Sequence, residues 1–532
     1  MAVIMKVISS EKINKALADF AGNSSRVFFF ALVAGVIMSL LSSLFIFDMF
    51  RDVASVYAYY AREISLGNWQ AGWVGRVPML HILLSGMWAK ISGLETFRAC
   101  VMISSLFFVL TIFPLRSFLL RYVSPLWSAW GCVLFIFAPK VIRYSVSGLL
   151  DSGRYFFLMA SLLCLFRLSD KQFKMRYALL GGVSLAGLSV SRGEGLVAAL
   201  LMLAGYPVLV LLKQKDDLYS LKYKKILTAW TLCGLFFCIG LLPFCYGNWK
   251  YNNCFVPDVR IKELFSSVTE LKSDRNAQSL QQQANTRLDA AAVVFAPTPV
   301  QSNFAEALKD ALRGGYELYL VFAITGMVIL CMTKKWNWEL ILLPCICLLH
   351  IIIYSKVVSS YRYSIYLVPL FMPFTITGLN FVGRKISVLF NRQYPHRHSG
   401  AIHLFALAVA SMLLFQAANG MKCVVERKDK KYYNAAEFIR DYAAKNFPGR
   451  RCRVASTQCP KTIYHSGAIA WWGYKQRELC NHDVNAFDLL LIDKKQNHEL
   501  LDLFENLYEI KTPESLPIRL FRKRYPVQEK SI

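Results

Sequence analysis

Apolar residues occur along this chain in long runs that are separated by short connectors rich in Lys and Arg. Most of these runs have the length that a single α-helix needs to cross a hydrocarbon core about 30 Å thick. Core helices of soluble proteins do not repeat this pattern many times over. The runs predict an α-helical polytopic membrane protein with about eleven transmembrane helices, at 27–47, 97–115, 125–139, 152–168, 177–191, 195–212, 226–246, 316–332, 338–355, 364–382 and 401–419.

The connectors assign parts of the chain to the two sides of the membrane. Residues 1–26 are polar and basic, so the positive-inside rule predicts a cytoplasmic N-terminus. Two long loops, 48–95 and 249–315, are then expected on the outer side, within a transmembrane domain that spans 27–420. After an odd number of spans, residues 421–532 also fall outside. We expect a multi-pass protein of the cell (inner) membrane with its active site facing away from the cytoplasm.

The last segment, residues 421–532, predicts a small extracytoplasmic α/β domain. Its hydrophobic pattern indicates helices at Tyr433–Asn446 and Glu499–Leu507, and strands at Arg453–Ser456, Phe487–Ile492, Tyr508–Lys511 and Ile518–Arg522. It contains no Gly-rich phosphate loop and no nucleophile elbow, so we expect a structural or acceptor-docking module. In an oxidising compartment, two of the four cysteines Cys423, Cys452, Cys459 and Cys480 are expected to form a disulfide, and Cys452–Cys480 is the favoured pair.

Composition supports the membrane prediction and weakens one alternative. Hydrophobic residues make up 55% of the 532 residues and the mean hydropathy is +0.37, whereas only 18% are charged. A soluble enzyme carries about a quarter charged residues. The net charge of +27 is high enough for a nucleic-acid-binding protein, but no compact basic module with a binding motif is present. We expect the cations to flank membrane spans and to contact anionic lipid headgroups, and we expect no nucleic-acid partner.

The first outer loop begins with the pattern of an amphipathic helix. After Asp52, apolar residues recur at helical spacing on one face, at Val53, Val56, Tyr57, Tyr60 and Ile64. Such a stripe predicts a helix that lies at the membrane interface, with Gly67 and Asn68 ending it. A second amphipathic stretch follows Pro78.

Two carboxylates, Asp48 and Asp52, lie where the first span leaves the bilayer. An acidic side chain at this depth is costly unless it is solvated or partnered, so both are candidates for function. Taken alone, both residues are equally compatible with ordinary polar positions that end a span.

The order of motifs in this loop resembles the family 39 glycosyltransferases. This group has the GT-C fold and includes protein O-mannosyltransferases and the aminoarabinose transferase of lipid A. The typical family order is an Asp after the first span, a Tyr, then A-R-E, G-D-W and K-P-P-L. The corresponding residues here are Asp52, Tyr57, Ala61-Arg62-Glu63, Gly67-Asn68-Trp69 and Arg76-Val77-Pro78-Met79-Leu80.

Later motifs continue the resemblance in the same order, over about residues 27–420. They are Phe97-Arg98, Ala138-Pro139, Leu150-Asp151, Ser191-Arg192-Gly193-Glu194-Gly195 and Ser360-Tyr361-Arg362-Tyr363. Three features depart from the family pattern. Val53 replaces an acidic residue, only Pro78 remains of two prolines, and the spacing from Asp52 to the A-R-E triplet is one residue longer. These departures keep Asp48 open as the alternative catalytic carboxylate.

The resemblance implies a membrane glycosyltransferase that moves a hexosyl or pentosyl group from a polyprenyl-phosphate donor to an acceptor. Asp52 would be the base that takes a proton from the acceptor hydroxyl or amine, in an inverting single displacement. Cations would stabilise the departing lipid phosphate. The candidates for that role are Arg76, which stands where the family has Lys, then Arg192 and Arg362, with Lys140 and Arg143 near the same depth.

Other residues in these motifs are assigned supporting roles. Asp151, Glu194 and Tyr57 are expected to orient the arginines or to bind sugar hydroxyls. The basic residues are also compatible with a plainer role as interfacial cations whose apolar stems lie along the membrane. No D-x-D metal motif accompanies them, so we expect a lipid-linked donor, no metal ligands and no required cofactor.

Two other functions fit the same spans. A transporter or flippase of lipid-linked sugars would need similar basic outer residues, although the paired halves with broken helices that many transporters have are not apparent here. An inactive scaffold with the same fold is the third interpretation, if the departures around Val53 disable the base. The acceptor class (protein, lipid or glycan) stays open.

Overall fold

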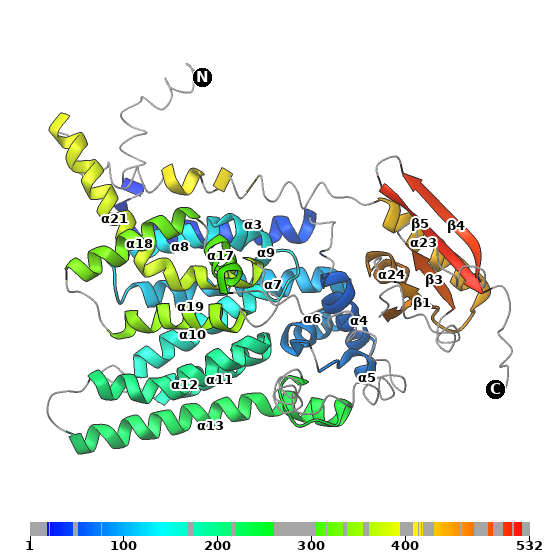
Figure 1. Ribbon diagram of the computed structural model, residues 1–532, viewed down its shortest axis with the longest axis horizontal. Coiled ribbons are helices and arrows are strands. Elements are labelled where there is room, and N and C mark those ends of the chain that lie inside the picture. The colour runs from blue at the N-terminus through cyan, green and yellow to red at the C-terminus, as the bar shows by residue number, and fades with distance from the viewer. Residues whose placement is uncertain are drawn as a thin grey trace.

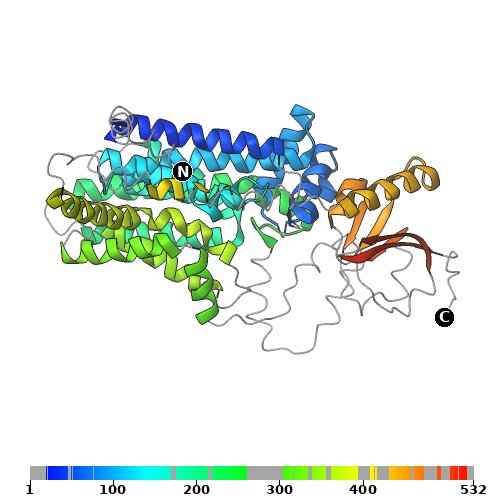
Figure 2. The ribbon, with the colours of Figure 1, turned by 90° about the horizontal axis from the view of Figure 1, so that it is seen from above.

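The computed structural model consists of a bundle of long helices with a small mixed sheet beyond one end of it (Figure 1). The view from above shows the same arrangement (Figure 2). The residues described are 19–20, 22–45, 50, 52–75, 77–168, 175–213, 219–259, 304–314, 317–333, 338–354, 361–393, 408–412, 414–415, 418, 430–456, 460–472, 488–492, 504–512 and 515–523.

Apolar runs of the sequence form the helices of the bundle. In chain order these are α3 (Ser24–Phe45), α7 (Thr96–Leu119), α8 (Pro125–Phe137), α9 (Pro139–Ser145), α10 (Asp151–Leu168), α11 (Met175–Ser191), α12 (Gly193–Lys213), α13 (Tyr219–Asn252), α17 (Phe304–Gly314), α18 (Glu317–Met332), α19 (Trp338–Tyr354), α20 (Tyr361–Ser364), η2 (Ile365–Leu367) and α21 (Val368–Gln393). Every predicted span except 401–419 overlaps one of these helices along most of its length, although α13 and α21 extend well beyond the predicted bounds. The range 401–419 lies mostly outside the described residues.

The bundle packs through helices that are adjacent in the sequence and through helices that are further apart, with small residues at one close contact. Helix α10 contacts α7 and α11, α11 contacts α13, and α18 contacts α21 along much of its length. A Cβ atom added at Gly326 would lie 2.0 Å from the carbonyl oxygen of Phe374, and one at Gly378 would lie 2.0 Å from that of Phe322. Glycine at both positions lets the two backbones touch, as small residues do at membrane helix interfaces.

Length and hydropathy identify fewer membrane spans than the sequence pattern. Among the described residues, four helical stretches are long and apolar enough to cross a membrane: Ser24–Phe45, Thr96–Leu119, Leu227–Asn252 and Ile365–Ile386. The pair α8 and α9, bent by 62°, makes a fifth if it is counted as one span. Helices α18 and α19 contain shorter apolar stretches. The multi-pass architecture therefore stands, and the number of eleven spans stays a prediction.

Three helices lie in the segment between α3 and α7: α4 (Ala58–Ser65), α5 (Trp69–Gly72) and α6 (Met79–Ser92). The first helix ends near Gly67, whose φ is +81°, and Pro78 precedes α6, both as predicted. Burial of this first helix is not confined to the predicted stripe. Tyr59 and Glu63 are only 6% and 2% exposed, and Glu63 is paired with Arg451 of the C-terminal domain. The position of the helix at the membrane interface stays a prediction.

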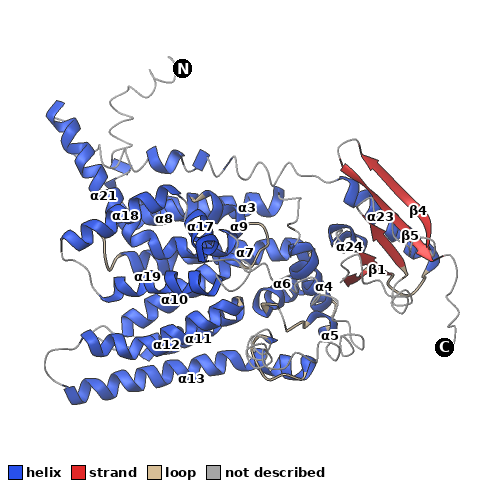
Figure 3. Ribbon diagram, viewed as in Figure 1, coloured by secondary structure: helices blue, strands red, loops and turns tan. Residues whose placement is uncertain are grey.

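Strands occur only in the C-terminal part of the described chain (Figure 3). Helix α23 (Lys430–Asn446), β1 (Arg453–Ser456), α24 (Pro460–Ser466), β2 (Ile469–Trp472), β3 (Leu489–Ile492), β4 (Phe504–Thr512) and β5 (Ser515–Lys523) follow in order. The sheet order is β2-β1-β3-β5-β4, in which β1 is parallel to β2 and β3, and the β4–β5 hairpin is antiparallel. Helices α23 and α24 pack against each other.

Two sequence predictions for this domain need correction. The helix expected at Glu499–Leu507 is wrong from Phe504 onward, because these residues form the start of β4. The β4–β5 register shifts between Asn506 and Tyr508, and this bulge interrupts the two-residue period that would identify a strand. Cys452 is a buried free cysteine, so its predicted pairing with Cys480 is also wrong.

Candidate active site

Asp52 begins the buried segment that leads away from the first span. It precedes a π-helical turn, η1 (Val53–Tyr57), which continues directly into α4. The amide of Ala58 donates to the carbonyl oxygen of Val53 and closes the wide ring of that turn. A π turn holds one residue more than an α turn. It therefore absorbs the extra residue between Asp52 and the Ala61-Arg62-Glu63 triplet.

The guanidinium of Arg362 joins two carboxylates from distant parts of the chain. Its Nη1 donates to Oδ2 of Asp52. Its Nη2 and Nε lie 3.1 and 3.2 Å from Oδ2 of Asp151, whose Oδ1 lies 3.4 Å from Nη1 of Arg192. These four residues, which we call the carboxylate–arginine cluster, come from four separate segments and balance two negative charges with two positive ones.

Three members of the cluster are buried, and the fourth is open to solvent. The side chains of Asp151, Arg362 and Arg192 are 3%, 12% and 13% exposed, whereas that of Asp52 is 34% exposed. Asp52 is thus the member of the cluster that an incoming molecule can reach most easily. Asp151 is the first residue of α10, where the helix dipole favours its negative charge.

Neighbouring charges keep Arg362 cationic in spite of its burial. Burial alone would lower the pKa of Arg362, but the carboxylates of Asp151 and Asp52, together with Tyr57, outweigh it and raise that pKa above its ordinary value. The pKa of Tyr57 is also raised, mainly by burial and further by Asp52 and Asp151. Tyr57 is therefore a neutral phenol that can donate a hydrogen bond beside the cluster.

His81 supports Tyr57 and the turn before Asp151, and the sequence analysis missed it. Its ring packs edge-on against Tyr57 at 5.8 Å, and its Nε2 lies 3.1 Å from the carbonyl oxygen of Gly148. Gly148 adopts a φ of +79° that favours glycine. Burial lowers the pKa of His81 to about 4, so the imidazole is neutral at physiological pH. The available sequence signal was a lone His in the stretch after Pro78.

The other predicted phosphate ligands differ in their distance from the cluster. The guanidinium carbons of Arg362 and Arg143 each lie 5.7 Å from the ring centroid of Tyr144. Arg143 is therefore one aromatic ring away from the cluster, and it also lies over Phe50. The amine of Lys140 donates instead to the carbonyl oxygen of Arg313, on α17.

A second buried group holds the segment that carries Arg362. The two ring nitrogens of His350 lie 3.0 Å from Oγ of Ser364 and 2.9 Å from the hydroxyl of Tyr366. Arg154, only 1% exposed, lies over the Tyr366 ring at 3.4 Å. His350 thereby ties α19 to α20 and η2, directly after Arg362. Nothing in the local sequence identifies this contact, because His350 lies within an apolar run.

Three of the predicted site residues cannot be placed at atomic detail. Asp48 and Arg76 lie outside the described residues, and the side chain of Glu194 does as well, although its backbone belongs to α12. The residue before Arg76 is fixed, since the amide of Val259 donates to the carbonyl oxygen of Gly75 at 3.0 Å. Within the described part of the chain, no three His, Cys, Asp or Glu side chains lie close enough to hold a metal ion.

The sequence matches no protein-family model, and no curated protein matches it. Solved structures do match. ArnT from Cupriavidus metallidurans bound to undecaprenyl phosphate is 10% identical, with a TM-score of 0.60 over 93% of this chain and 97% of that protein. The oligosaccharyltransferase of Archaeoglobus fulgidus, tethered to an acceptor peptide, is 12% identical, with a TM-score of 0.51 over 92% and 74% of the two chains. At such low identity, the likeness establishes the shared GT-C fold alone.

Proposed function

Because the chain has the GT-C fold of membrane glycosyltransferases, we propose that it transfers a sugar from a polyprenyl-phosphate donor to an acceptor hydroxyl or amine. The observation that carries the proposal is the carboxylate–arginine cluster, in which the partly exposed Asp52 pairs with Arg362, and buried Asp151 joins Arg362 to Arg192. A base and a phosphate-binding cation are what such a transfer requires of the protein. The similar ArnT structure is bound to undecaprenyl phosphate, which supports this donor class.

Asp52 is the base in this proposal. The acceptor oxygen or nitrogen attacks the anomeric carbon while Asp52 takes the acceptor proton, and the bond from that carbon to the phosphate oxygen breaks. The lipid phosphate leaves with the bonding electron pair, and the sugar is transferred with inversion. Exposure of Asp52, in contrast to the burial of Asp151, favours it for contact with the acceptor.

Arg362 and Arg192 bind the donor phosphate in the proposal. Planar guanidinium groups bind phosphate oxygens through paired hydrogen bonds, and their charge stabilises the leaving phosphate. Arg362 already donates to both carboxylates, so a bound phosphate would compete with Asp52 for it. Donor binding would thus free Asp52 to accept the acceptor proton. Asp151 would keep Arg192 and the rest of Arg362 in place.

The remaining candidates are assigned by their positions. Arg76 stays a proposed phosphate ligand from the resemblance, and Arg143, one ring from the cluster, is a further proposed cation for the phosphate. Lys140 is less favoured, since its amine is bonded to α17. Tyr57 and Glu194 are proposed to bind sugar hydroxyls. The cations in these steps are all side chains, and the proposal assigns no step to a metal.

The proposal places this chemistry on the outer side of the cell membrane. The basic residues 1–26 favour a cytoplasmic N-terminus. The cluster lies at the end of the bundle that faces the C-terminal domain, because the segment of Asp52 continues into α4, which that domain covers (Figure 1). If the N-terminus is inside and the first span ends near Asp52, the cluster and the C-terminal domain are both outside.

A donor assay tests the proposed function. Purified protein is incubated with a panel of polyprenyl-phosphate sugars, and released polyprenyl phosphate is measured with and without acceptor candidates. Release that depends on Asp52 supports a transferase. Movement of a lipid-linked sugar across vesicles without its cleavage would instead support the transporter. Binding of polyprenyl phosphate without turnover of any sugar would support the inactive scaffold.

A further inference from the structure

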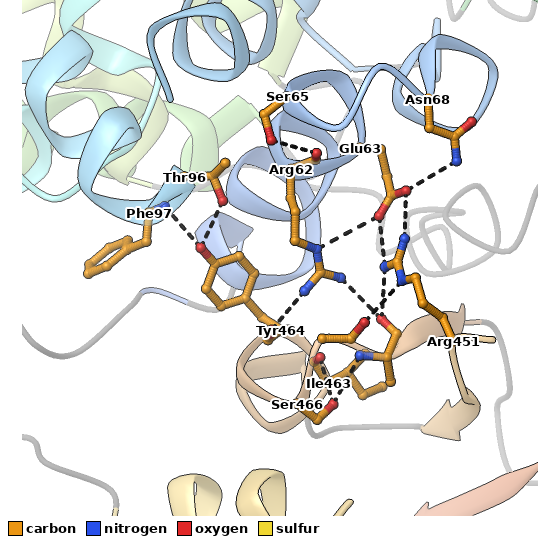
Figure 4. A network of polar contacts seen from close by, with 12 residues as sticks. Arg62, Glu63, Ser65, Asn68, Thr96, Phe97, Arg451, Ile463, Tyr464 and Ser466 are labelled. Carbon is orange, nitrogen blue, oxygen red and sulfur yellow. Dashed lines mark hydrogen bonds and ion pairs between the residues drawn. The ribbon is translucent and has the colours of Figure 1, made fainter. Parts of the chain in front are cut away.

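The helical segment that begins at Asp52 contacts the C-terminal domain at its far end, through α4 (Figure 4). Glu63, on α4, is 2% exposed and receives two parallel hydrogen bonds from Arg451, both of 2.9 Å. Asn68 donates to the same carboxylate at 3.2 Å. Arg451 is itself fixed to its own domain, because its Nε donates to the carbonyl oxygen of Gly467 at 3.1 Å. A paired guanidinium–carboxylate contact of this kind sets orientation as well as distance.

Arg62, also on α4, donates hydrogen bonds to the C-terminal domain, whereas Glu63 accepts them from it. Its two Nη atoms donate to the carbonyl oxygens of Tyr464 and Ala468, at 2.9 and 3.1 Å. Its guanidinium carbon lies 5.1 Å from the ring centroid of Tyr59 and 5.5 Å from that of Tyr464. Arg62 and Glu63, which are adjacent on α4, thus both bind the C-terminal domain. Glu63 accepts hydrogen bonds from that domain, and Arg62 donates hydrogen bonds to it.

The same domain also contacts the start of the second span. The hydroxyl of Tyr464 lies 2.8 Å from Oγ1 of Thr96 and accepts a hydrogen bond from the amide of Phe97 at 3.0 Å. The C-terminal domain therefore fixes α4 relative to the bundle at two points. Because the domain contacts both α4 and α7, it fixes the orientation of α4 at Glu63 relative to the bundle, whose helices carry the rest of the cluster.

Glu63 and Asp52 belong to one continuous helical segment. The π turn η1 runs into α4 without a break, and nearly every residue from Val53 to Ile64 is buried. A helical segment of this length, about 16 Å from Asp52 to Glu63, transmits a rotation at one end to the other. The bonds to Arg362 and the approach of an acceptor both depend on where Asp52 points.

We propose that Glu63 and Arg451 are positioning residues, through which the C-terminal domain holds Asp52 and Tyr57 in their working orientation. The inference rests on the proposed function for its catalytic part, since it assigns the base to Asp52. Neither residue touches the cluster, and both act through the helix. The domain is then a part of the catalytic machinery.

Replacing Arg451 by Ala in the full-length protein tests this proposal. We expect turnover per binding site to fall about tenfold to a hundredfold, as for a displaced catalytic group, while undecaprenyl phosphate binds with unchanged stoichiometry and affinity. Arg451→Lys should recover part of the loss. Amide hydrogen exchange across residues 53–65 should become faster in the Ala variant, and this readout needs no activity.

A matched control is available within the same domain. Arg450 makes an equally close pair with Asp488, at 2.8 and 3.1 Å, but that pair does not contact α4. Arg450→Ala should leave turnover and exchange at 53–65 unchanged. If Arg450→Ala and Arg451→Ala lose activity equally, or if Arg451→Ala keeps full turnover or wild-type exchange at 53–65, the positioning role is wrong.

Glu63→Gln provides the same test if Arg451→Ala does not fold. It keeps the side-chain shape and removes the charge, and it should give the same loss of turnover with retained binding. Should the wild-type protein neither bind undecaprenyl phosphate nor release it from any donor, the proposed function fails. In that case the exchange measurement alone decides whether the C-terminal domain orders the helix.

Discussion

Arg362 pairs with Asp52, a residue that lies 310 positions earlier in the chain. The pair connects the segment that follows α3 to the segment that precedes α21. Asp151 binds the same guanidinium group. A cation held between two carboxylates is fixed in place before any substrate arrives. A third anion, such as a phosphate, can also compete with one of the two carboxylates for the guanidinium of Arg362.

Replacing Asp52 by Asn removes basicity and keeps the shape of the side chain. We expect sugar transfer to fall by about two to four orders of magnitude, the usual contribution of a general base. Expression and binding of the donor should persist. Initial rates with purified variants at saturating donor measure the effect.

The corresponding Asp48→Asn variant is the control for that change. It should be much milder, because the resemblance assigns the base to Asp52. An inactive Asp48 variant beside an active Asp52 variant would keep the fold and overturn the residue assignment. Full activity in both variants would mean that the base lies elsewhere.

Arg362 should be more sensitive to substitution than Arg192. Arg362→Ala leaves Asp52 without this partner and leaves buried Asp151 with Arg192, and breaking a buried pair costs about 3–5 kcal/mol. Arg192→Ala removes a longer contact to Asp151, of 3.4 Å, and leaves the pair of Arg362 with both carboxylates in place. We expect a lower unfolding temperature and weaker undecaprenyl-phosphate binding for Arg362→Ala than for Arg192→Ala. Equal effects would indicate that Arg362 has no special bridging role.

Arg76 is expected to contact the donor phosphate. Arg76→Ala should weaken donor binding more than Arg76→Lys, since Lys keeps the charge and loses the planar fork. Titration with undecaprenyl phosphate compares the two. Wild-type binding by both variants would show that Arg76 is only a surface anchor.

His465 gives the C-terminal domain a pH dependence. Burial, with the cations of Lys461, Arg440 and Arg62, lowers its pKa from 6.5 to about 4. Between these values the unfolded domain binds a proton that the folded domain does not, so stability falls as the pH drops through this range. Unfolding temperatures at about pH 7 and about pH 5 should differ less in His465→Asn. An unchanged difference would exclude His465 as the source.

The proposed topology predicts that the two ends of the chain lie on opposite sides of the membrane. A reporter that is active only outside the cytoplasm, fused after Ile532, should be active. The same reporter fused before the first span should be silent. A silent C-terminal fusion that is well expressed would overturn the odd number of spans.

The sequence predicted the features that depend on neighbouring residues. Apolar runs located the bundle helices, Gly67 and Pro78 located the ends of helices in the first loop, and weak motifs in order indicated the fold. It also selected Asp52, Asp151, Arg192 and Arg362 separately, from motifs far apart in the chain. Their assembly into one network depends on the packing of four segments, which local patterns do not specify.

The failures of sequence reasoning have the same cause. Glu63 was identified only as part of a motif, and its buried ion pair with Arg451 depends on the contact between α4 and the C-terminal domain. His350 lies in an apolar run that gives no sign of a polar contact. Its ring nitrogens are nevertheless within hydrogen-bond distance of Ser364 and Tyr366, just after Arg362. The strand predicted at Tyr508–Lys511 is confirmed as part of β4, whereas the start of β4, before the register shift at Asn506 and Tyr508, was mistaken for a helix.

Because of the π turn at Val53–Tyr57, this helical segment can accommodate the loss of one residue more easily than the gain of one. A chain one residue shorter here can close an ordinary α turn and still aim its carboxylate at the same arginine. A chain one residue longer has no spare turn left to open, and its carboxylate would rotate by about 100° away from that arginine. Sequence divergence in this loop can therefore proceed by loss of a residue more readily than by gain. An aligned pair of such chains would show a gap beside an aspartate that has not moved in space.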